Sequence, residues 1–495
     1  MNSGLNIRRS LEVIPGIISW GIIILLVILS ILHPVFCAII IIVFDFYWII
    51  RSAYLTTLLV MAYQKLHRQK DKDWLKECQE VTPGWQELYH LIIFPVYKED
   101  LQILRPSLEA LKACHYPKDK MIVVMAFEER NPDSRKNAGI LEAEFKDSFL
   151  RFLPTFHPDG LPGEKRTKGA NSTWAAKKAR EFLHSKGINE ENVIASCFDA
   201  DTCVDKEYFG CLSYHFLTSK KPHQASYQPI PVYNNNIWQA PSFARIVEIG
   251  GSFCQMIESM RLEKFVTFSS HSMSFKTLVD IDYWPVDMIS DDSVIYWKAF
   301  LFYQGEYRVI PLYITVSMDV AYSNTLLKTI VMQYKQKRRW AWGVENFPFV
   351  VSRFLQNNQI PFFRKIRRSF HLLESHVTWA VWAIILLVIG PLPVLLGGAF
   401  FSHMAIGYNL PKITGLLFKF TLFTSLTWII LSRTILPPRP RGVSGLRSIL
   451  MVLEWGIVPF VILILGSTPA LDAQTRIMLA KYMEFNPTAK ARKMI

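Results

Sequence analysis

The chain has 495 residues; 51% are hydrophobic and only 19% are charged, yet 55 Lys and Arg against 41 Asp and Glu give a formal net charge of +14. The hydrophobic content excludes a disordered chain, and seven Cys in so long a chain exclude a small disulfide-stabilised protein. The length accommodates two or three soluble domains, or one large domain with a membrane part.

The N-terminal region is apolar. Asp45 is the one charged side chain between Val13 and Ile50, and Pro34 interrupts the run. Because a spanning helix needs about 20 apolar residues, we expect a permanent helical hairpin over roughly 13–33 and 35–60 rather than a cleaved signal peptide. Basic residues at both ends place them in the cytoplasm. Asp45 is either a functional intramembrane charge or a carboxylate paired with a neighbouring helix.

A second apolar region follows the basic stretch 364–368. Residues 375–411 carry no formal charge, and further spans are expected at roughly 413–433 and 449–468. If 375–411 is one tilted helix, the C-terminal set has three spans; we favour two short helices and four spans, because the stretch exceeds one bilayer crossing. The predicted parts are a transmembrane hairpin (1–63), a cytoplasmic domain (64–342), an interfacial amphipathic segment (343–371), three or four transmembrane helices (372–468) and a basic tail (469–495).

The positive charge is explained by a membrane surface, because basic residues flank the spans and face anionic headgroups. A nucleic-acid-binding protein would show a basic stripe with interleaved aromatic residues in a soluble domain, and we see none. We therefore expect a multi-pass protein of the plasma (inner) membrane, with no nucleic acid among its partners.

Strands alternate with helices in the central segment. Leu88–Val96, Met121–Phe127 and Val193–Phe198 are continuous apolar runs typical of buried parallel strands. This alternation predicts an α/β, Rossmann-like fold, whose ligands bind at the carboxyl ends of the strands. Acidic residues follow each predicted strand: Glu99, Glu128 with Glu129, and Asp199 with Asp201.

Asp199 and Asp201, two residues apart, carry the most specific chemistry. Two such carboxylates can hold Mg²⁺ or Mn²⁺ together with a substrate phosphate. The alternative is a solvated turn or a helix cap. A zinc site is not indicated, because the sequence has no Cys-x-x-Cys pair.

Three further segments contain candidate site residues. The basic loop 163–171 includes Lys168 and leads into a helix that Asn171 or Ser172 can cap, which suits a phosphate-bearing ligand or is simply a solvated loop. Asp292 opens a helix predicted over 293–300 and is either a general base or a residue that interacts with the helix dipole. On a later helix three side chains share one turn and either converge on a ligand or form an interfacial segment: Gln336, Arg339 and Trp340.

Together, in this order and between apolar helices, these segments resemble the membrane-integrated family 2 glycosyltransferases, such as cellulose, chitin and hyaluronan synthases. The most specific matches are Asp199-x-Asp201 and Gln336-x-x-Arg339-Trp340, with Asp292 at the position of the family's catalytic carboxylate. The resemblance implies a GT-A fold inserted between N- and C-terminal transmembrane helices. It also implies a nucleotide-sugar donor, usually UDP-linked, and inversion at the anomeric carbon.

The resemblance also implies a role for each matching residue. Asp292 would deprotonate the acceptor hydroxyl, Asp199 and Asp201 would hold the Mg²⁺ or Mn²⁺, and Lys168 would contact the diphosphate. The remaining donor residues would be Pro95, Tyr97 and Glu99 beside the nucleoside, Glu128 or Glu129 at the base, and Gln336, Arg339 and Trp340 below the diphosphate; Ser270, His271 and Trp340 would contact the acceptor.

The resulting hypothesis is a metal-dependent, inverting hexosyltransferase that elongates a polysaccharide and moves it across the membrane. Its partners would be a nucleotide sugar, the growing polymer and the lipid bilayer. The first alternative is transfer of a single sugar to a membrane lipid. A second is a transporter or scaffold with a degenerate cytoplasmic domain.

Overall fold

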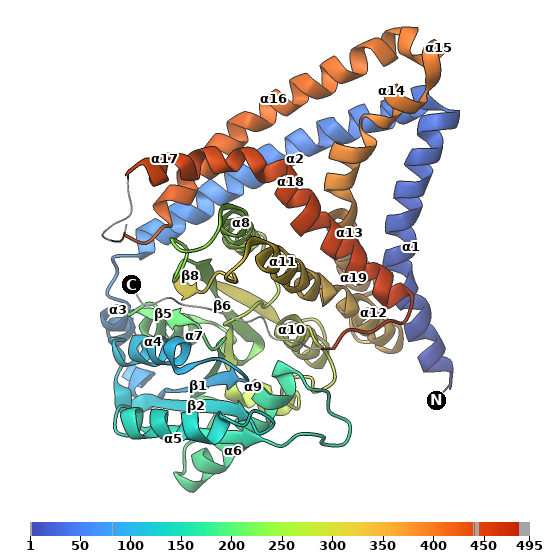
Figure 1. Ribbon diagram of the computed structural model, residues 1–495. Helices are drawn as coiled ribbons and strands as arrows, with labels where there is room; N and C mark the ends of the chain where they lie inside the picture. Colours follow the sequence, from blue (N-terminus) through green and yellow to red (C-terminus); the bar gives the residue numbers. More distant parts are fainter. Residues whose placement is uncertain (1, 82, 439, 441–444, 485–495) are drawn as a thin grey trace. The chain divides into compact units, whose positions relative to one another are not determined.

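The computed structural model describes residues 2–81, 83–438, 440 and 445–484 (Figure 1). The chain groups into two compact units. The first, which we call the sheet unit, contains residues 62–239 and 254–323, and the second, the helical unit, contains residues 2–61, 240–253 and 324–483.

The described part of the sheet unit contains one mixed, eight-stranded sheet in the order β3-β2-β1-β4-β7-β6-β8-β5. Four neighbouring strands, β3, β2, β1 and β4, are parallel, whereas β7 runs antiparallel to both β4 and β6. The strands are β1 (Tyr89–Val96), β2 (Met121–Glu128), β3 (Arg151–His157), β4 (Val193–Cys197), β5 (Cys203–Val204), β6 (Ala225–Tyr233), β7 (Ser272–Ser274) and β8 (Arg308–Met318).

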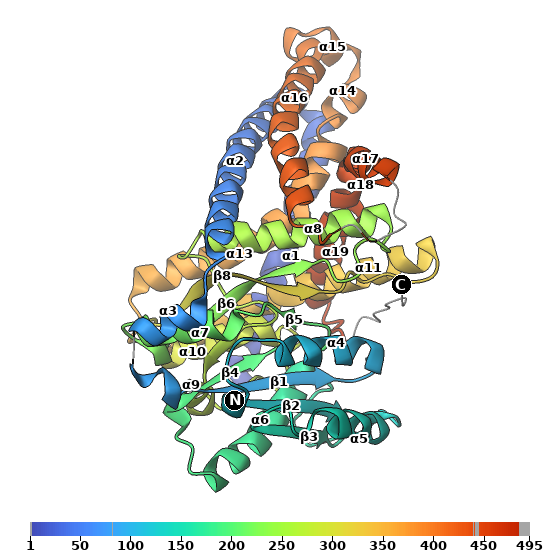
Figure 2. The same ribbon diagram turned by 90° about the vertical axis from the view of Figure 1, so that its left-hand side faces the viewer.

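The order of the strands creates a switch point beside β1. The chain runs outward from β1 through β2 to β3, and β4 then pairs with the opposite edge of β1. Figure 2 shows β1 and β2 side by side. In parallel sheets a crevice forms at such a point, outside the carboxyl ends of the strands, and ligands bind there.

Helices connect the strands and contribute to the hydrophobic core. Those with all their residues in the sheet unit are α3 (Trp74–Val81), α4 (Leu101–Lys112), α5 (Ser134–Phe145), α6 (Lys168–Ser185), α7 (Tyr208–Thr218), α9 (Phe275–Asp280) and α10 (Asp291–Phe302). The helix α8 (Ser242–Ser259) contributes residues to both units.

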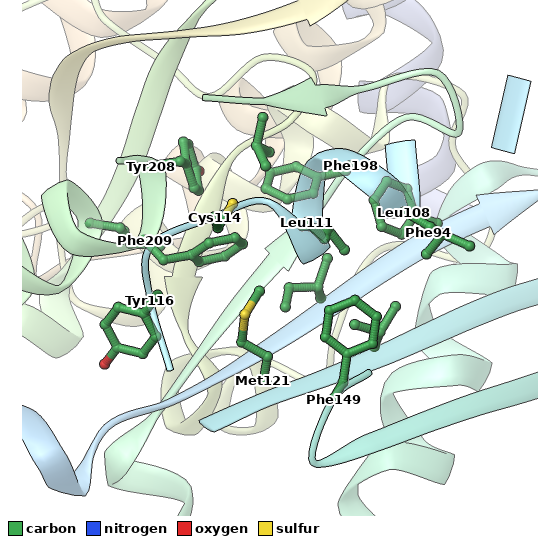
Figure 3. Close-up of a cluster of buried hydrophobic side chains, with 14 of the residues drawn as sticks. Phe94, Leu108, Leu111, Cys114, Tyr116, Met121, Phe149, Phe198, Tyr208 and Phe209 are labelled. Carbon is green, nitrogen blue, oxygen red and sulfur yellow. The ribbon is translucent and has the colours of Figure 1, made fainter. Parts of the chain in front are cut away.

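The core of the sheet unit explains why its strands are continuous apolar runs. All eight residues of β2 are buried. Figure 3 shows Phe94 of β1 near Leu108 of α4, with Phe198 and Phe209 in the same cluster. Burying each such side chain stabilises the fold by roughly 1.5–3 kcal/mol. The predicted α/β class is therefore confirmed, and the three predicted strands differ from β1, β2 and β4 by one residue at most.

The helical unit contains the apolar segments. Its helices are α1 (Asn2–Leu32), α2 (Pro34–Gln69, as far as residue 61), α11 (Leu326–Ala341), α12 (Asn346–Gln356), α13 (Phe362–Ile384), α14 (Leu392–Leu396), α15 (Gly398–His403), α16 (Ala405–Thr434), α17 (Gly445–Leu453), α18 (Val458–Ile462) and α19 (Thr468–Met478).

Five helical stretches within the described residues are long and apolar enough to cross a membrane. They are Ile7–Leu32, Pro34–Gln69, Phe362–Ile389, Ala405–Thr434 and Ile449–Met478. The C-terminal set therefore has three candidate spans, the lower of the two counts that the sequence allows. Between Phe362–Ile389 and the start of α16, the chain forms only the short helices α14 and α15. Pro391 and Pro393 lack the backbone N–H that a continuous helix requires.

The helix α2 packs against α13 and α16. It lies beside α16 (Figure 1, Figure 2), where the Trp428 indole donates to Thr56 over 2.9 Å. Trp48 stacks on Trp382 of α13, with ring centroids 4.6 Å apart. Asp45 is only 6% exposed, and its carboxylate has no hydrogen-bond or ion-pair partner among the described residues, so the pairing considered for it is not found there.

Candidate active site

The centre of the sheet unit's polar site is the Lys168 ammonium group. Its Nζ lies 2.8 Å from Oδ1 of Asp199, and 2.9 and 3.2 Å from Oδ1 and Oδ2 of Asp292. The Lys168 side chain is 10% exposed, while those of Asp199 and Asp292 are 28% and 25% exposed. Burial opposes the positive charge, but the two carboxylates outweigh it and hold the pKa of Lys168 well above its usual value. One cation therefore joins two acidic groups.

The start of α6 places Lys168 between these carboxylates. The helix is capped by Thr167, whose hydroxyl accepts the Ala170 N–H over 3.2 Å, rather than by the predicted Asn171 or Ser172. Gly169 permits a close approach, because a Cβ there would lie 2.4 Å from the Pro285 carbonyl oxygen. The loop before α10 can thus pass against the first turn of α6.

Asp292 lies in the first turn of α10, which begins at Asp291 rather than at the predicted residue 293. Its backbone oxygen accepts the Thr267 hydroxyl over 2.6 Å. Nδ1 of His271 is 3.8 Å from Oδ1 of Asp292, and burial lowers the pKa of this histidine. Asp292 is thus held from its backbone while its carboxylate faces Lys168.

Asp199 and Asp201, the predicted metal ligands, have different surroundings. Asp199 follows β4, and its Oδ2 accepts the Ser269 hydroxyl over 2.7 Å. Asp201 is fully buried, and its Oδ2 accepts the Asp319 N–H at the end of β8 over 2.7 Å. Asp201 therefore joins the Asp199 turn to β8, and only Asp199 is partly exposed beside Lys168.

The arrangement of these donors can be tested against a divalent cation. Mg²⁺ and Mn²⁺ need several oxygen ligands with free lone pairs on one side. Lys168 and Ser269 each donate to one oxygen of Asp199, so a cation would have to displace the ammonium group, and Asp201 is covered. Nowhere in the described part of the chain do three or more His, Cys, Asp or Glu side chains form a group that could hold a metal ion. As placed, the residues do not fit a metal site.

The predicted acceptor residues Ser270 and His271 are buried next to this site. Their exposed fractions are 0% and 1%, and the hydroxyl of Ser270 is 3.0 Å from that of Thr202. Ser270 has a positive φ of 65°, which is uncommon for a residue with a side chain and occurs often at functional sites. In this conformation the side chains of Ser270 and His271 pack inside the protein, next to Thr202 and Asp292 respectively.

The predicted nucleoside residues lie at the ends of β1 and β2. Pro95 is in β1, and the loop that follows is held by the Glu99 carboxylate, which accepts the Tyr97 N–H over 2.8 Å. The Arg130 guanidinium lies 4.1 Å from the centroid of the Tyr97 ring and 3.1 Å from Oε2 of Glu128.

The two acidic residues after β2 differ. Glu128 is 4% exposed, whereas Glu129 lies at the surface, 2.6 Å from the Arg135 guanidinium. Glu128 therefore lies with Tyr97 and Arg130, and Glu129 faces outward.

His157, at the end of β3, was not found by sequence reasoning. Its Nε2 is 2.9 Å from Glu164 and its Nδ1 is 3.5 Å from Glu128. Burial opposes protonation, but these two hydrogen bonds outweigh it and raise the pKa of His157. The strand β3 lacks a continuous apolar run, so no pattern marked its end.

The remaining predicted residues, Gln336, Arg339 and Trp340, lie on α11 in the helical unit. Gln336 is buried, and its Oε1 has no hydrogen-bond partner among the described residues. The neighbouring Lys337 places its Nζ 2.9 Å from Oε2 of Glu248 and 3.4 Å from the centroid of the Trp340 ring. Glu248 was missed, because nothing in the sequence of α8 links it to α11.

Comparison with solved structures finds similar proteins at low sequence identity. Mannosyltransferase PcManGT from Pyrobaculum calidifontis, in complex with GDP-Man and Mn²⁺, is 14% identical, with a TM-score of 0.42 over 80% of this chain and 98% of that one. S. aureus TarS residues 1–349, in complex with UDP-GlcNAc, is 14% identical, with a TM-score of 0.40 over 72% of this chain and 95% of that one. No curated protein sequence matches this chain.

The family follows from the sequence itself. Residues 196–465 match the family model described as glycosyl transferase family group 2. The match includes Asp199, Asp201, Asp292 and the Gln336-x-x-Arg339-Trp340 motif. The mixed α/β sheet and the apolar helices before and after it in sequence agree with the predicted GT-A fold. Because the matched segment is more than half of the chain, the protein belongs to glycosyl transferase family group 2.

Proposed function

We propose that the protein is a membrane-bound, inverting hexosyltransferase that elongates a polysaccharide. Its donor would be a nucleoside-diphosphate sugar, and we assign a UDP-sugar to this role. The observation that carries this proposal is the set Lys168, Asp199 and Asp292. It lies at the carboxyl edge of parallel strands, where ligands of such sheets bind, and it combines a cation for a diphosphate with a carboxylate base.

The proposed reaction needs one proton transfer and one displacement. A carboxylate oxygen of Asp292 takes the proton of the acceptor hydroxyl as that oxygen attacks the anomeric carbon. The new C–O bond forms on one face of the sugar while the bond to the diphosphate breaks on the other, which inverts the stereocentre. The leaving diphosphate keeps the electron pair, and the Lys168 ammonium compensates its negative charge.

The donor pocket would extend from Lys168 toward β1 and β2. We assign the contact with the nucleobase to Glu128 rather than Glu129, because Glu128 lies beside Arg130 and the Tyr97 ring whereas Glu129 pairs with Arg135 at the surface. Pro95 and Glu99 would shape the loop around the nucleoside. Mg²⁺ or Mn²⁺ remains a prediction from the sequence, and no step above depends on it.

The acceptor would meet the enzyme through α11. We assign its contacts to Gln336, Arg339 and Trp340. Ser270 and His271 would help to position Asp292, the proposed base. Five apolar helical stretches support a multi-pass protein, and the basic residues beside them favour a cytoplasmic sheet unit in the plasma (inner) membrane. Passage of the product through the helical unit is part of the proposal.

A screen of the purified full-length protein against UDP- and GDP-sugars, measuring nucleotide release and product size, tests this function. We expect Asp292→Asn to reduce turnover by about 100- to 10,000-fold, the usual contribution of a general base. Asp287→Asn, at an exposed residue five positions upstream, is the matched control and should transfer normally.

Three outcomes would revise the proposal. Wild-type turnover in Asp292→Asn would refute the assignment of the base. A product with one added sugar on a lipid would replace polymer elongation by single transfer. Absence of both transfer and nucleotide binding would favour a transporter or scaffold.

A further inference from the structure

The ion pair between Lys168 and Asp292 conflicts with the role of each residue in transfer. Both carboxylate oxygens of Asp292 lie within 3.2 Å of the ammonium group. A general base needs a free lone pair within hydrogen-bond reach of the acceptor hydroxyl. In this conformation both carboxylate oxygens of Asp292 accept hydrogen bonds from a cation instead of facing an acceptor hydroxyl.

The hydrogen-bond donors of Lys168 are also in use. An ammonium group has three N–H donors, and here they serve the carboxylates of Asp199 and Asp292. Diphosphate oxygens are strong acceptors for ammonium donors. A diphosphate that binds Lys168 must therefore compete with these carboxylates for the same donors.

We propose that Lys168 is a donor-operated latch on Asp292: it blocks the base in the empty site, and the diphosphate of the arriving nucleotide sugar releases the base by drawing the ammonium away. This inference rests on the proposed function. It makes donor binding a condition for activation of the acceptor, so the acceptor hydroxyl loses its proton only when a sugar is in place to react.

The neighbouring contacts allow the latch to open without loss of the site. Asp199 would keep its hydrogen bond from Ser269, at 2.7 Å, when the ammonium moves. Asp292 would keep its backbone contact with Thr267, at 2.6 Å, which leaves the carboxylate in place. The side chains of both aspartates are about one quarter exposed, so a ligand can approach the carboxylates that hold the ammonium group.

The latch predicts coupling between two substitutions in nucleotide binding. In the wild type, part of the binding free energy of UDP separates Lys168 from Asp292. Asp292→Asn weakens this pair, so it should tighten UDP binding by about tenfold, which corresponds to one hydrogen bond to a charged group. In Lys168→Met, which has no ammonium to release, Asp292→Asn should change UDP affinity by less than about twofold.

The experiment is calorimetric titration of full-length protein with UDP and, separately, GDP, in EDTA and then in Mn²⁺. It uses the wild type, Asp292→Asn, Lys168→Met and the double variant, a cycle that isolates the pairwise coupling. Asp287→Asn removes a nearby exposed carboxylate and controls for the general electrostatic field. Lys168→Arg, which keeps a cation, serves if Lys168→Met does not fold, and in it Asp292→Asn must still tighten binding.

Each result decides the proposal. Coupling of about tenfold that Asp287→Asn does not reproduce supports the latch. Equal tightening with and without Lys168, or no tightening by Asp292→Asn in the wild type, overturns the latch and leaves the proposed function intact. Absence of UDP and GDP binding in every variant would instead refute the proposed function, and the latch with it.

Discussion

Two lysines, Lys168 in the sheet unit and Lys337 in the helical unit, each form an ion pair with acidic side chains, but the two ion pairs differ in exposure. Lys337 and its partner Glu248 are 4% and 0% exposed, and the ammonium also lies over the Trp340 ring. Lys168 is 10% exposed, but its two carboxylate partners are open by about one quarter. Water and ligands can therefore reach one pair and not the other.

The difference shows what an ion pair contributes to each unit. A fully desolvated pair is costly to break, because the remaining charge is left in a medium of low polarizability. A partly exposed pair can exchange one partner for a ligand, because solvent and the ligand both stabilise the separated charges. We therefore regard Lys337–Glu248 as a fixed contact between α8 and α11, and Lys168 as an exchangeable one.

The largest expected effect is on the fixed contact. Lys337→Met should lower the free energy of unfolding of the helical unit by about 3–5 kcal/mol, because it leaves the carboxyl group of Glu248 buried without its cation. The double variant Lys337→Met with Glu248→Gln should recover most of this loss. Thermal unfolding of the full-length protein in detergent, followed by tryptophan fluorescence, measures both.

Lys168→Met provides the direct contrast. The carboxylates that it leaves behind are partly hydrated, so its cost should be smaller, about 1–3 kcal/mol. If Lys168→Met destabilises the protein as much as Lys337→Met, or if the double variant recovers nothing, the distinction between a fixed and an exchangeable pair is wrong.

A smaller effect is expected from His157, which, like Lys168, lies between two carboxylates. Its pKa is raised in the folded protein, so the stabilisation by protonated His157 is complete below about pH 6.5, the unfolded value. It is lost as the pH rises through the folded pKa. The wild type should therefore become less stable from pH 6 to 8, and His157→Gln should flatten that decline.

The control for this measurement is His184→Gln. His184 is more than half exposed and lies 2.8 Å from Glu190. Its replacement should leave the pH dependence of the unfolding temperature nearly unchanged. An identical decline in the wild type and His157→Gln would show that the contacts with Glu128 and Glu164 do not favour the protonated form.

The sequence was sufficient for those parts of the fold that depend on local pattern. The strands β1, β2 and β4 are buried on both faces and therefore read as continuous apolar runs. Short strands were missed, because β5 and β7 have only two and three residues and owe their pairing to distant partners. The number of C-terminal spans stays open at three or four in the sequence, because composition alone does not show where prolines end a helix.

The sequence singles out candidate site residues one by one but not their arrangement in space. Motifs identified Lys168, Asp199 and Asp292, yet the contact between Lys168 and Asp292 joins residues 124 positions apart. It depends on the loop that approaches Gly169 and on the first turn of α10, which no local signal describes. For the same reason the sequence treated Asp199 and Asp201 as equivalent carboxylates, whereas the fold buries one and exposes the other.

The smallest expected effect belongs to an exposed pair on the same helix as Lys168. Lys178 lies 2.8 Å from Glu181 and 5.7 Å from the centroid of the Trp174 ring, and both charged side chains are more than 40% exposed. Hydration and salt weaken such a pair, so Lys178→Met should change the free energy of unfolding by less than about 0.5 kcal/mol. Chemical unfolding at about 0.01 M and at about 1 M salt, between which the Debye length falls from about 30 Å to about 3 Å, measures this in parallel with Lys168→Met. A loss above that bound for Lys178→Met would show that exposure does not rank the ion pairs of this protein, because a well-hydrated pair would then stabilise the fold more than such pairs do.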